Sequence, residues 1–145
     1  MRKLVIAIST LAFAGSAAFA DPILDRQALM KERGKIVGGL SKVAKGEEPF
    51  DAAAVLTQLQ ALQANAEKFD VDALFPKGSD TGDTTAGPKI WEDTAGFKAA
   101  EDKYLADVKA AVAGAPADAD ALKAQVGNLG SDCGACHQGY RIKKG

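Results

Sequence analysis

Residues 118–145 read DADALKAQVGNLGSDCGACHQGYRIKKG and contain both cysteines and the only histidine of the chain. Apolar or thiol side chains recur at every third or fourth position of this segment, which is the period of one helix face. The segment therefore predicts a helix that begins near Asp118 or Asp120, runs almost to the end of the chain and turns its cysteines toward the core. The residues of this stripe are Leu122, Val126, Leu129, Cys133, Cys136 and Tyr140.

Within this helix, Cys133, Cys136 and His137 have the spacing C-x-x-C-H. Residues three and four apart lie on one face of a helix, so the three side chains point toward the same volume. The spacing is typical of a c-type haem attachment site. Two thiols add to the haem vinyl groups, and the imidazole becomes the proximal iron ligand. The motif therefore predicts one haem c, with its iron, attached through both cysteines.

Other uses of the two thiols fit the sequence less well. A thioredoxin-like dithiol is expected beside a βαβ unit, but no strand-like alternation is present. A structural zinc site needs four ligands, and the chain offers three soft ones. A disulfide between residues three apart would close a very small loop and stabilise little. One alternative that stays open is a helical interaction protein without haem, in which the thiols are structural or paired.

Three further segments have helical periodicity, at about residues 21–44, 52–69 and 92–113. Asp21-Pro22 supplies a cap and a proline at the first helical position, and Asp51 is the expected N-cap of the second helix. Between the second and third helices, residues 75–91 are dense in Gly, Pro, Thr and Asp and indicate a long surface crossover. The pattern predicts an all-α fold, an antiparallel four-helix bundle with covalently attached haem.

The first 20 residues, MRKLVIAISTLAFAGSAAFA, have the pattern of a secretory signal peptide. Arg2 and Lys3 precede an apolar stretch that ends in the cleavage signature Ala18-Phe19-Ala20. This stretch is shorter than the ~20 apolar residues of a comfortable membrane span. We expect cleavage before Asp21, a mature domain at residues 21–145 and a periplasmic location. A retained N-terminal anchor is the alternative.

Charge excludes one large class of partners. Cleavage would leave 16 basic and 19 acidic residues, a formal charge of −3 with the bases interspersed. Such a mildly acidic domain lacks the basic patch of a nucleic-acid binder. No segment after residue 20 is apolar enough to cross a membrane.

The sequence also restricts the second axial ligand of the iron. His137 is the only histidine, and Met30 would be the only methionine left after cleavage. A His/Met pair is the usual ligation of an electron-transfer cytochrome c. Arg26, Met30, Gly34 and Gly38 form one row on the first helix, which leaves room for a flat macrocycle and places Arg26 near a propionate. Alternatively, Met30 fills the core and Arg26 is a solvated charge.

Three stretches together resemble the class II c-type cytochromes, the family of cytochrome c prime. They are DRQALMKERG at residues 25–34, PKIW at residues 88–91 with the helix containing Phe97 after it, and CGACHQGYR at residues 133–141. The resemblance covers essentially the whole mature chain. It implies a four-helix bundle with C-x-x-C-H near the C-terminus.

The resemblance also implies roles for individual residues. Members that look like cytochrome c prime have a non-ligating residue over the distal face of the haem, whereas the low-spin members resembling cytochrome c-556 have methionine there, and Met30 matches that position. Arg26 matches a basic residue near a propionate. Trp91 is expected at the haem edge or, alternatively, as an aromatic residue at the end of the bundle. Arg141 is expected near the imidazole or a propionate or, alternatively, as a solvated base that favours the helix dipole.

These observations predict a periplasmic monohaem cytochrome that carries one electron and is not an enzyme. His137 and Met30 would be the axial ligands of a low-spin iron. The expected partners are redox proteins of an electron-transfer chain, with no nucleic acid and no membrane, and both a monomer and a homodimer remain open. The alternative function is a five-coordinate haem protein that binds nitric oxide or carbon monoxide.

Overall fold

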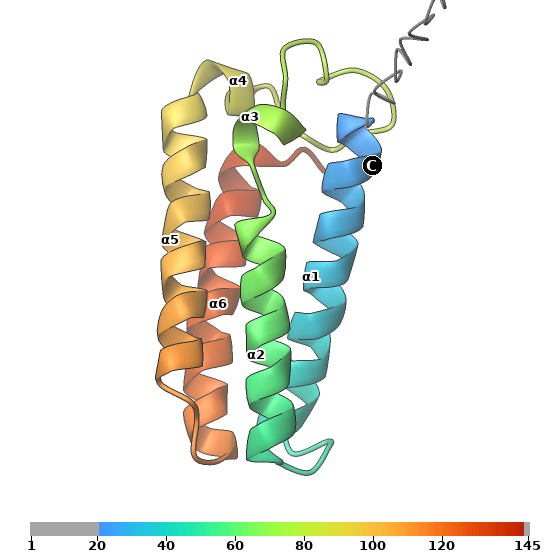
Figure 1. The fold of residues 1–145 in the computed structure, drawn as a ribbon. Coiled ribbons are helices and arrows are strands. Elements are labelled where there is room, and N and C mark those ends of the chain that lie inside the picture. The colour runs from blue at the N-terminus through green and yellow to red at the C-terminus, as the bar shows by residue number, and fades with distance from the viewer. Residues whose placement is uncertain (1–20, 144–145) are drawn as a thin grey trace, which may run out of the picture.

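The computed structural model describes residues 21–143, so the predicted signal peptide lies outside the described part. The prediction of an all-α fold is confirmed, and the third long helix begins at Thr94, two residues later than expected. Two short helices in and before the crossover were not predicted. The helices are α1 (Pro22–Ala44), α2 (Ala52–Glu67), α3 (Val71–Leu74), α4 (Lys89–Glu92), α5 (Thr94–Ala113) and α6 (Ala119–Tyr140) (Figure 1).

Each long helix begins at an aspartate whose carboxylate accepts a backbone N–H of the first turn. The acceptors are Asp21, Asp51, Asp93 and Asp118, with distances between 2.7 and 3.0 Å. A cap of this kind satisfies a donor that the helix leaves unpaired and contributes roughly 1 kcal/mol. Local chemistry therefore fixes where all four helices start.

The four long helices form a ring in which each one packs against two others. Helix α1 lies against α2 and α6, and α5 lies against the same two helices, so α1 and α5 are diagonal to each other. Successive long helices run in opposite directions (Figure 1). The crossover with α3 and α4 lies at the end of the bundle where α1 begins and α6 ends. The C-terminal motif, the start of α1 and the crossover therefore meet at this end.

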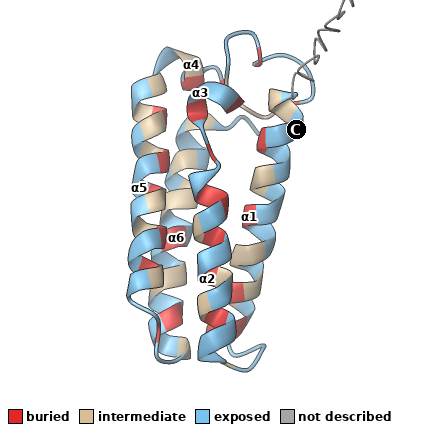
Figure 2. Ribbon diagram, in the orientation of Figure 1, coloured by how far each residue is buried: buried red, intermediate tan, exposed pale blue. Residues whose placement is uncertain are grey.

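The interior contains two hydrophobic cores. Buried positions recur along all four long helices (Figure 2). The long core includes Leu40, Leu59, Leu62, Val108, Leu122 and Leu129, all at most 1% exposed. The crossover core contains Phe69, Val71, Leu74, Ile90 and Phe97. Burying one leucine side chain contributes about 2 kcal/mol, so the long core supplies most of the packing energy. Cys133 packs against the long core and Cys136 against the crossover core.

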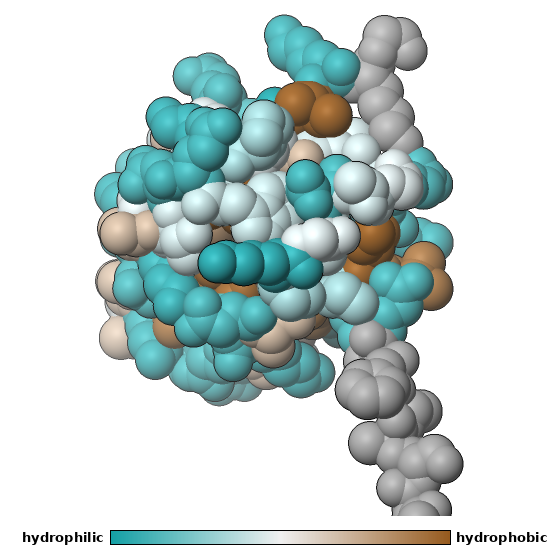
Figure 3. Space-filling view, turned by 90° about the horizontal axis from the view of Figure 1, so that it is seen from above, coloured by the Kyte–Doolittle hydropathy of each residue, from teal (hydrophilic) through white to brown (hydrophobic). Residues whose placement is uncertain are grey.

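The surface of the crossover end is mostly polar. Seen from above, hydrophilic residues and residues of intermediate hydropathy cover most of this face, and hydrophobic ones are confined to a few places (Figure 3). In the part of the chain that the structure describes, Leu24 and Ile142 are the exposed large hydrophobic residues. Within residues 21–143, no helix combines the length and the apolar character that crossing a membrane requires.

Candidate haem-binding site

A cavity of about 560 Å³ lies at the crossover end, between α1, α5, α6 and the crossover. Helix α6 contributes Cys133, Cys136 and His137 to its lining, and α1 contributes Met30. These positions are more than 100 residues apart in the sequence, but α1 and α6 are neighbours in the bundle. The structure therefore brings the four residues of the predicted haem site together in one cavity.

Both cysteines are half-buried free thiols. Burial raises the pKa of Cys133, and burial together with the Glu101 carboxylate raises the pKa of Cys136 to about 11. The thiolate is the form that reacts with oxidants and metals. Because both pKa values are raised, the two side chains are mostly in the protonated thiol form at neutral pH and react slowly with oxidants. They are available for addition to a vinyl group that enters the cavity.

His137 lies on the last turn of α6, lines the cavity and is exposed to solvent. Partial loss of hydration lowers the pKa of its imidazole, and the positive charges of Arg141 and Arg33 lower it further. The ring is therefore neutral at physiological pH, which is the form that binds iron.

Met30 belongs to the same cluster of side chains as Cys136. Both are half-buried and pack against the crossover core. Because the thioether is flexible and polarisable, it can fill a gap in this cluster or turn toward a metal in the cavity. The structure places Met30 where ligation is possible, and its role as a ligand stays a prediction.

Aromatic and aliphatic side chains form the inner wall of the cavity. Phe97 contacts Phe75 and Tyr140 with ring centroids 4.9 and 5.0 Å apart, and Phe69 and Ile90 extend the wall. Edge-on and tilted contacts at these distances are favourable for aromatic pairs. The wall is apolar and suits one face of a large hydrophobic ring.

Arg26 anchors the crossover, which closes the cavity on the side not formed by α1, α5 and α6. Its two terminal nitrogens donate to the carbonyl oxygens of Leu74 and Ser79 at 3.0 and 2.6 Å. They also donate to the hydroxyls of Ser79 and Thr84 at 3.0 and 2.8 Å. Arg26 is buried and lines the cavity, so it lies where a propionate contact is possible. Its observed role is to anchor the crossover, and the propionate contact stays a prediction.

Trp91 and Arg141 have different positions relative to the cavity. The indole of Trp91 donates to the carbonyl oxygen of Phe75 at 3.0 Å, and Trp91 is not among the cavity-lining residues. This position matches the alternative of an aromatic residue at the end of the bundle, and contact with the haem edge stays a prediction. Arg141 does line the cavity, and its Nε donates to the hydroxyl of Thr85 at 3.3 Å.

Two cavity residues, Arg33 and Glu101, did not emerge from the sequence analysis. They form a buried ion pair with 3.1 Å between Nη1 and Oε2. A signal for each was present in the sequence. Arg33 lies three residues after Met30 on α1, and Glu101 lies between Phe97 and Tyr104 on the apolar stripe of α5. A charged residue at a core position indicates a buried partner, although the pattern does not identify that partner.

The cavity fits a haem with covalent attachment. Within residues 21–143, no group of three or more His, Cys, Asp or Glu side chains is arranged to hold a metal ion by itself. The site instead offers two thiols, an imidazole and a thioether beside an apolar wall. A Cβ built on Gly34, which also lines the cavity, would meet no atom within 4 Å. This open strip along α1 suits a flat macrocycle.

Comparisons with known proteins agree with this arrangement. The cytochrome c′ family model matches residues 21–141. A cytochrome c-556 of Agrobacterium fabrum is 41% identical over 131 residues, which are 90% of this chain and 88% of that protein. A cytochrome c′ of Rhodopseudomonas palustris is 38% identical over 150 residues, 99% of each chain. A nitric oxide complex of a cytochrome c prime variant from Alcaligenes xylosoxidans superimposes with a TM-score of 0.76 at 32% identity, covering 88% of this chain and 98% of that one.

The fold and the site define a c-type haem protein built on a four-helix bundle. The chain belongs to the cytochrome c′ family, which includes proteins named cytochrome c-556 and cytochrome c′. Its cofactor is haem c with iron, and the haem-free interaction protein is excluded. Haem proteins of this family are electron carriers or gas binders.

Proposed function

We propose that the protein is a periplasmic one-electron carrier whose haem iron is low-spin and ligated by His137 and Met30. One observation carries the proposal: the only methionine after residue 20 lines the same cavity as the only histidine, from a neighbouring helix. A ligand on each of two packed helices keeps the coordination unchanged between oxidation states. Little reorganisation is then needed when an electron enters or leaves.

The bound haem supplies an iron that alternates between Fe(III) and Fe(II), and the chain supplies its position and surroundings. Cys133 and Cys136 would fix the macrocycle to α6 through thioether bonds. His137 is neutral before ligation and needs no proton loss to bind iron. The apolar wall around Phe97 would exclude water from the inner face of the bound haem.

Attachment through both thiols is tested by replacing Cys133 and Cys136 with serine together. The variant should be produced without covalent haem in cells that mature c-type cytochromes. The measurement is haem absorbance that survives denaturation and acid–acetone extraction. Colour that persists through this treatment would reject the attachment proposal.

The proposed periplasmic location is based on residues 1–20, and the proposed partners are based on the charge and surface of the domain that follows. The signal-peptide pattern at residues 1–20 supports export to the periplasm, where covalent attachment prevents loss of the haem. The mildly acidic charge and the mostly polar crossover end support brief encounters with soluble redox proteins (Figure 3). A carrier of this kind has protein partners and no substrate of its own.

The axial ligands are tested by optical spectra of the holoprotein, recorded oxidised, reduced, and reduced under carbon monoxide. His/Met ligation predicts sharp reduced bands, a weak near-infrared band from sulfur to Fe(III), and little response to carbon monoxide. A broad high-spin spectrum that shifts readily with carbon monoxide would reject Met30 as the ligand.

Gas binding is the second candidate function, and one observation favours it. The similar structure from Alcaligenes xylosoxidans is a nitric oxide complex of a cytochrome c prime variant. In this chain, gas binding requires that Met30 only packs in the cavity or is easily displaced. The same carbon monoxide experiment separates the two functions, because a five-coordinate iron binds the gas and a His/Met iron resists it.

A further inference from the structure

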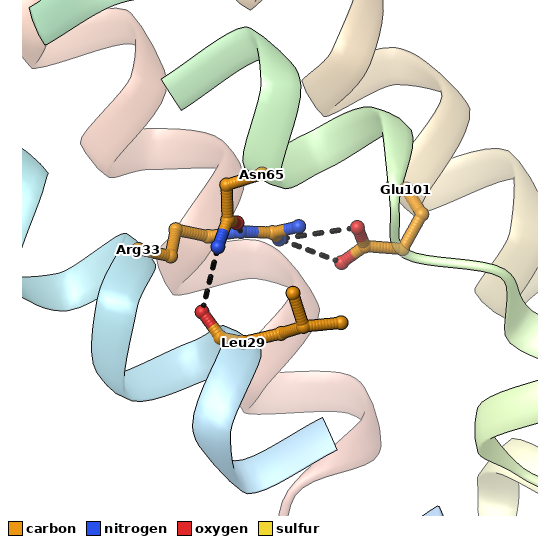
Figure 4. Close-up of polar contacts among 4 residues, drawn as sticks. All are labelled: Leu29, Arg33, Asn65 and Glu101. Atoms are coloured by element: carbon orange, nitrogen blue, oxygen red, sulfur yellow. Dashed lines mark hydrogen bonds and ion pairs between the residues drawn. The ribbon is translucent and has the colours of Figure 1, made fainter. Parts of the chain in front are cut away.

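The Arg33–Glu101 pair crosses the interior of the bundle beside the haem cavity (Figure 4). Nη1 of Arg33 donates to both carboxylate oxygens of Glu101, at 3.2 Å to Oε1 and 3.1 Å to Oε2. Arg33 is 6% exposed and Glu101 is 9% exposed. They lie on the diagonal helices α1 and α5, so the pair occupies space that apolar side chains would otherwise fill.

The surroundings of Arg33 fix its guanidinium in place. Nε donates to the Asn65 side-chain oxygen at 3.1 Å, and Asn65 in turn donates to the carbonyl oxygen of Leu29 at 3.1 Å (Figure 4). The guanidinium also lies over the rings of Phe69 and Tyr104, 4.9 and 4.4 Å from their centroids. The positive charge is therefore held rigidly, and the carboxylate is the member of the pair that can change its charge.

Two polar atoms beside the pair have no partner among the described residues. Nη2 of Arg33 and the hydroxyl of Tyr104 are both buried without a hydrogen bond. Both side chains line the haem cavity, next to Cys133. Unsatisfied buried donors of this kind make the polar end of the cavity sensitive to any change in charge within it.

Glu101 also lines a second pocket, which shares only Phe69 and Glu101 with the lining of the haem cavity. This pocket has a volume of about 220 Å³ and lies between the start of α3 and the first half of α5. Its other polar lining residues are Asp70, Lys98 and Asp102, of which the two aspartates are exposed. The Glu101 carboxylate therefore lies between the haem cavity on one side and a pocket lined by solvated charges on the other.

We propose that Glu101 takes up a proton from solvent through the second pocket when the haem is reduced, and releases it when the haem is oxidised. One electron from a protein donor converts Fe(III) to Fe(II), and one proton converts the Glu101 carboxylate to the neutral acid. Reoxidation returns both. The inference rests on the proposed electron-carrier function and adds proton uptake to it.

Electrostatics gives the direction of this coupling. Reduction removes one positive charge from the cavity, so a nearby carboxylate holds its proton more tightly. Burial raises the pKa of Glu101, and the Arg33 charge opposes that rise. The pKa of the Glu101 carboxyl therefore lies above that of an ordinary glutamate.

Several other charged or titratable groups face Glu101, and none duplicates its position. Asp132 and Cys133 approach from α6, Lys98 and Asp102 from α5 itself, and Asp70 from the start of α3. Helix α2 contributes the neutral Asn65, which bonds to Arg33. Of the carboxylates among these residues, Glu101 alone lines both the haem cavity and the second pocket.

The test is the midpoint potential of the holoprotein, measured by spectroelectrochemistry between about pH 5 and pH 9, the range in which buried glutamates titrate. One proton per electron predicts that the potential falls as pH rises. The limit is about 59 mV per pH unit, because a tenfold change corresponds to that value for a one-electron couple. The variant Glu101→Gln should lose most of this slope. The control Glu47→Gln, an exposed loop carboxylate, should keep it.

A second variant and a second measurement allow the proposal to be tested even if Glu101→Gln alone folds poorly. Glu101→Gln leaves Arg33 without its partner, so Arg33→Met with Glu101→Gln removes both charges and should also give a flat potential. Redox-difference infrared spectra should contain a carboxylic acid C=O band on reduction in the natural protein. That band should be missing in both variants.

Two outcomes would overturn the inference: a flat potential in the natural protein, or a slope that persists in both variants. Either outcome in a protein with a low-spin spectrum leaves the electron-carrier function intact. A high-spin spectrum that responds to carbon monoxide would instead reject the carrier function. Even then, the pH dependence of the midpoint potential in the natural protein and in the two Glu101 variants would decide whether Glu101 takes up a proton on reduction.

Discussion

The backbone N–H of Gly87 donates to the carbonyl oxygen of Tyr140 at 2.8 Å, and a Cβ on Gly87 would lie 2.9 Å from that same oxygen. This contact joins the end of the crossover to the last residue of α6. Ile142 continues the contact by donating its N–H to the carbonyl oxygen of Thr85 at 2.9 Å. The crossover therefore fixes the turn of α6 that carries His137.

Replacement of Gly87 by alanine should destabilise the protein by roughly 1–3 kcal/mol, because the methyl group meets a fixed backbone oxygen. The measurement is the free energy of unfolding from urea titration. Gly139→Ala on α6 is the control, since a Cβ there meets nothing within 4 Å and helix propensity favours alanine by about 1 kcal/mol. Equal effects of the two substitutions would show that the Gly87–Tyr140 contact is not tight in solution.

Much of the fold could be predicted because it depends on local chemistry. Asp21 and Asp51 are caps in the sequence and in the structure, and the cap of α6 is Asp118, one of the two starts that the sequence left open. The apolar stripes face the interior as their period requires. The short helices α3 and α4 could not be predicted in this way. The C-terminal carbonyl of α3 accepts a hydrogen bond from Arg26, 48 residues away, and no local pattern encodes such a contact.

The residues of the site also fall into two groups, those that local sequence predicts and those that depend on long-range packing. Cys133, Cys136 and His137 are recognisable from their spacing, and Met30 because the mature chain would contain no second histidine and no other methionine. The Arg33–Glu101 pair spans 68 residues and depends on the diagonal packing of α1 and α5. Periodicity places each residue on an inner face but does not determine which residue it meets.

The Arg33–Glu101 pair should behave as a coupled unit in stability measurements. Arg33→Met alone should cost about 3–5 kcal/mol, because it leaves an unpaired carboxylate in the interior. Arg33→Met combined with Glu101→Leu should recover most of that loss, since two apolar side chains replace two buried charges. A double-mutant cycle of unfolding free energies measures the coupling. Additive effects would mean that the pair is hydrated and weak.

The pH dependence of stability should also reflect the titration of the Glu101 carboxyl. Burial raises the pKa of Glu101 above the value of 4.5 for an unperturbed carboxyl, so the folded protein holds this proton more tightly than the unfolded chain. Its contribution is therefore complete below the unfolded pKa and is lost as pH rises through the folded pKa. The difference in unfolding free energy between the natural protein and Glu101→Gln should follow this curve. A difference that is constant with pH would contradict the assignment.

Gly34 should be required for the haem to lie flat against α1. Gly34→Leu places a branched side chain in the cavity, so we expect a several-fold lower yield of covalent haem per protein during co-expression with a maturation system. Gly127→Leu is the matched control, because Gly127 is also helical with nothing within 4 Å of its Cβ position but does not line the cavity. Equal haem yields from the two variants would show that α1 does not contact the macrocycle.

Met30→Ala should convert the holoprotein from a low-spin form to a high-spin form that binds carbon monoxide, while covalent haem is retained. Removal of the thioether leaves His137 as the single protein ligand of the iron. It should also cost on the order of 2 kcal/mol of stability through lost packing.

Leu29→Ala separates ligation from packing. Leu29 is half-buried and packs against the crossover core as Met30 does, but it does not line the cavity. This control should lose similar stability and stay low-spin. If Met30→Ala also stayed low-spin, another side chain would be the sixth ligand. Lys31 would be the next candidate, because it lines the same cavity and its amine binds iron once deprotonated.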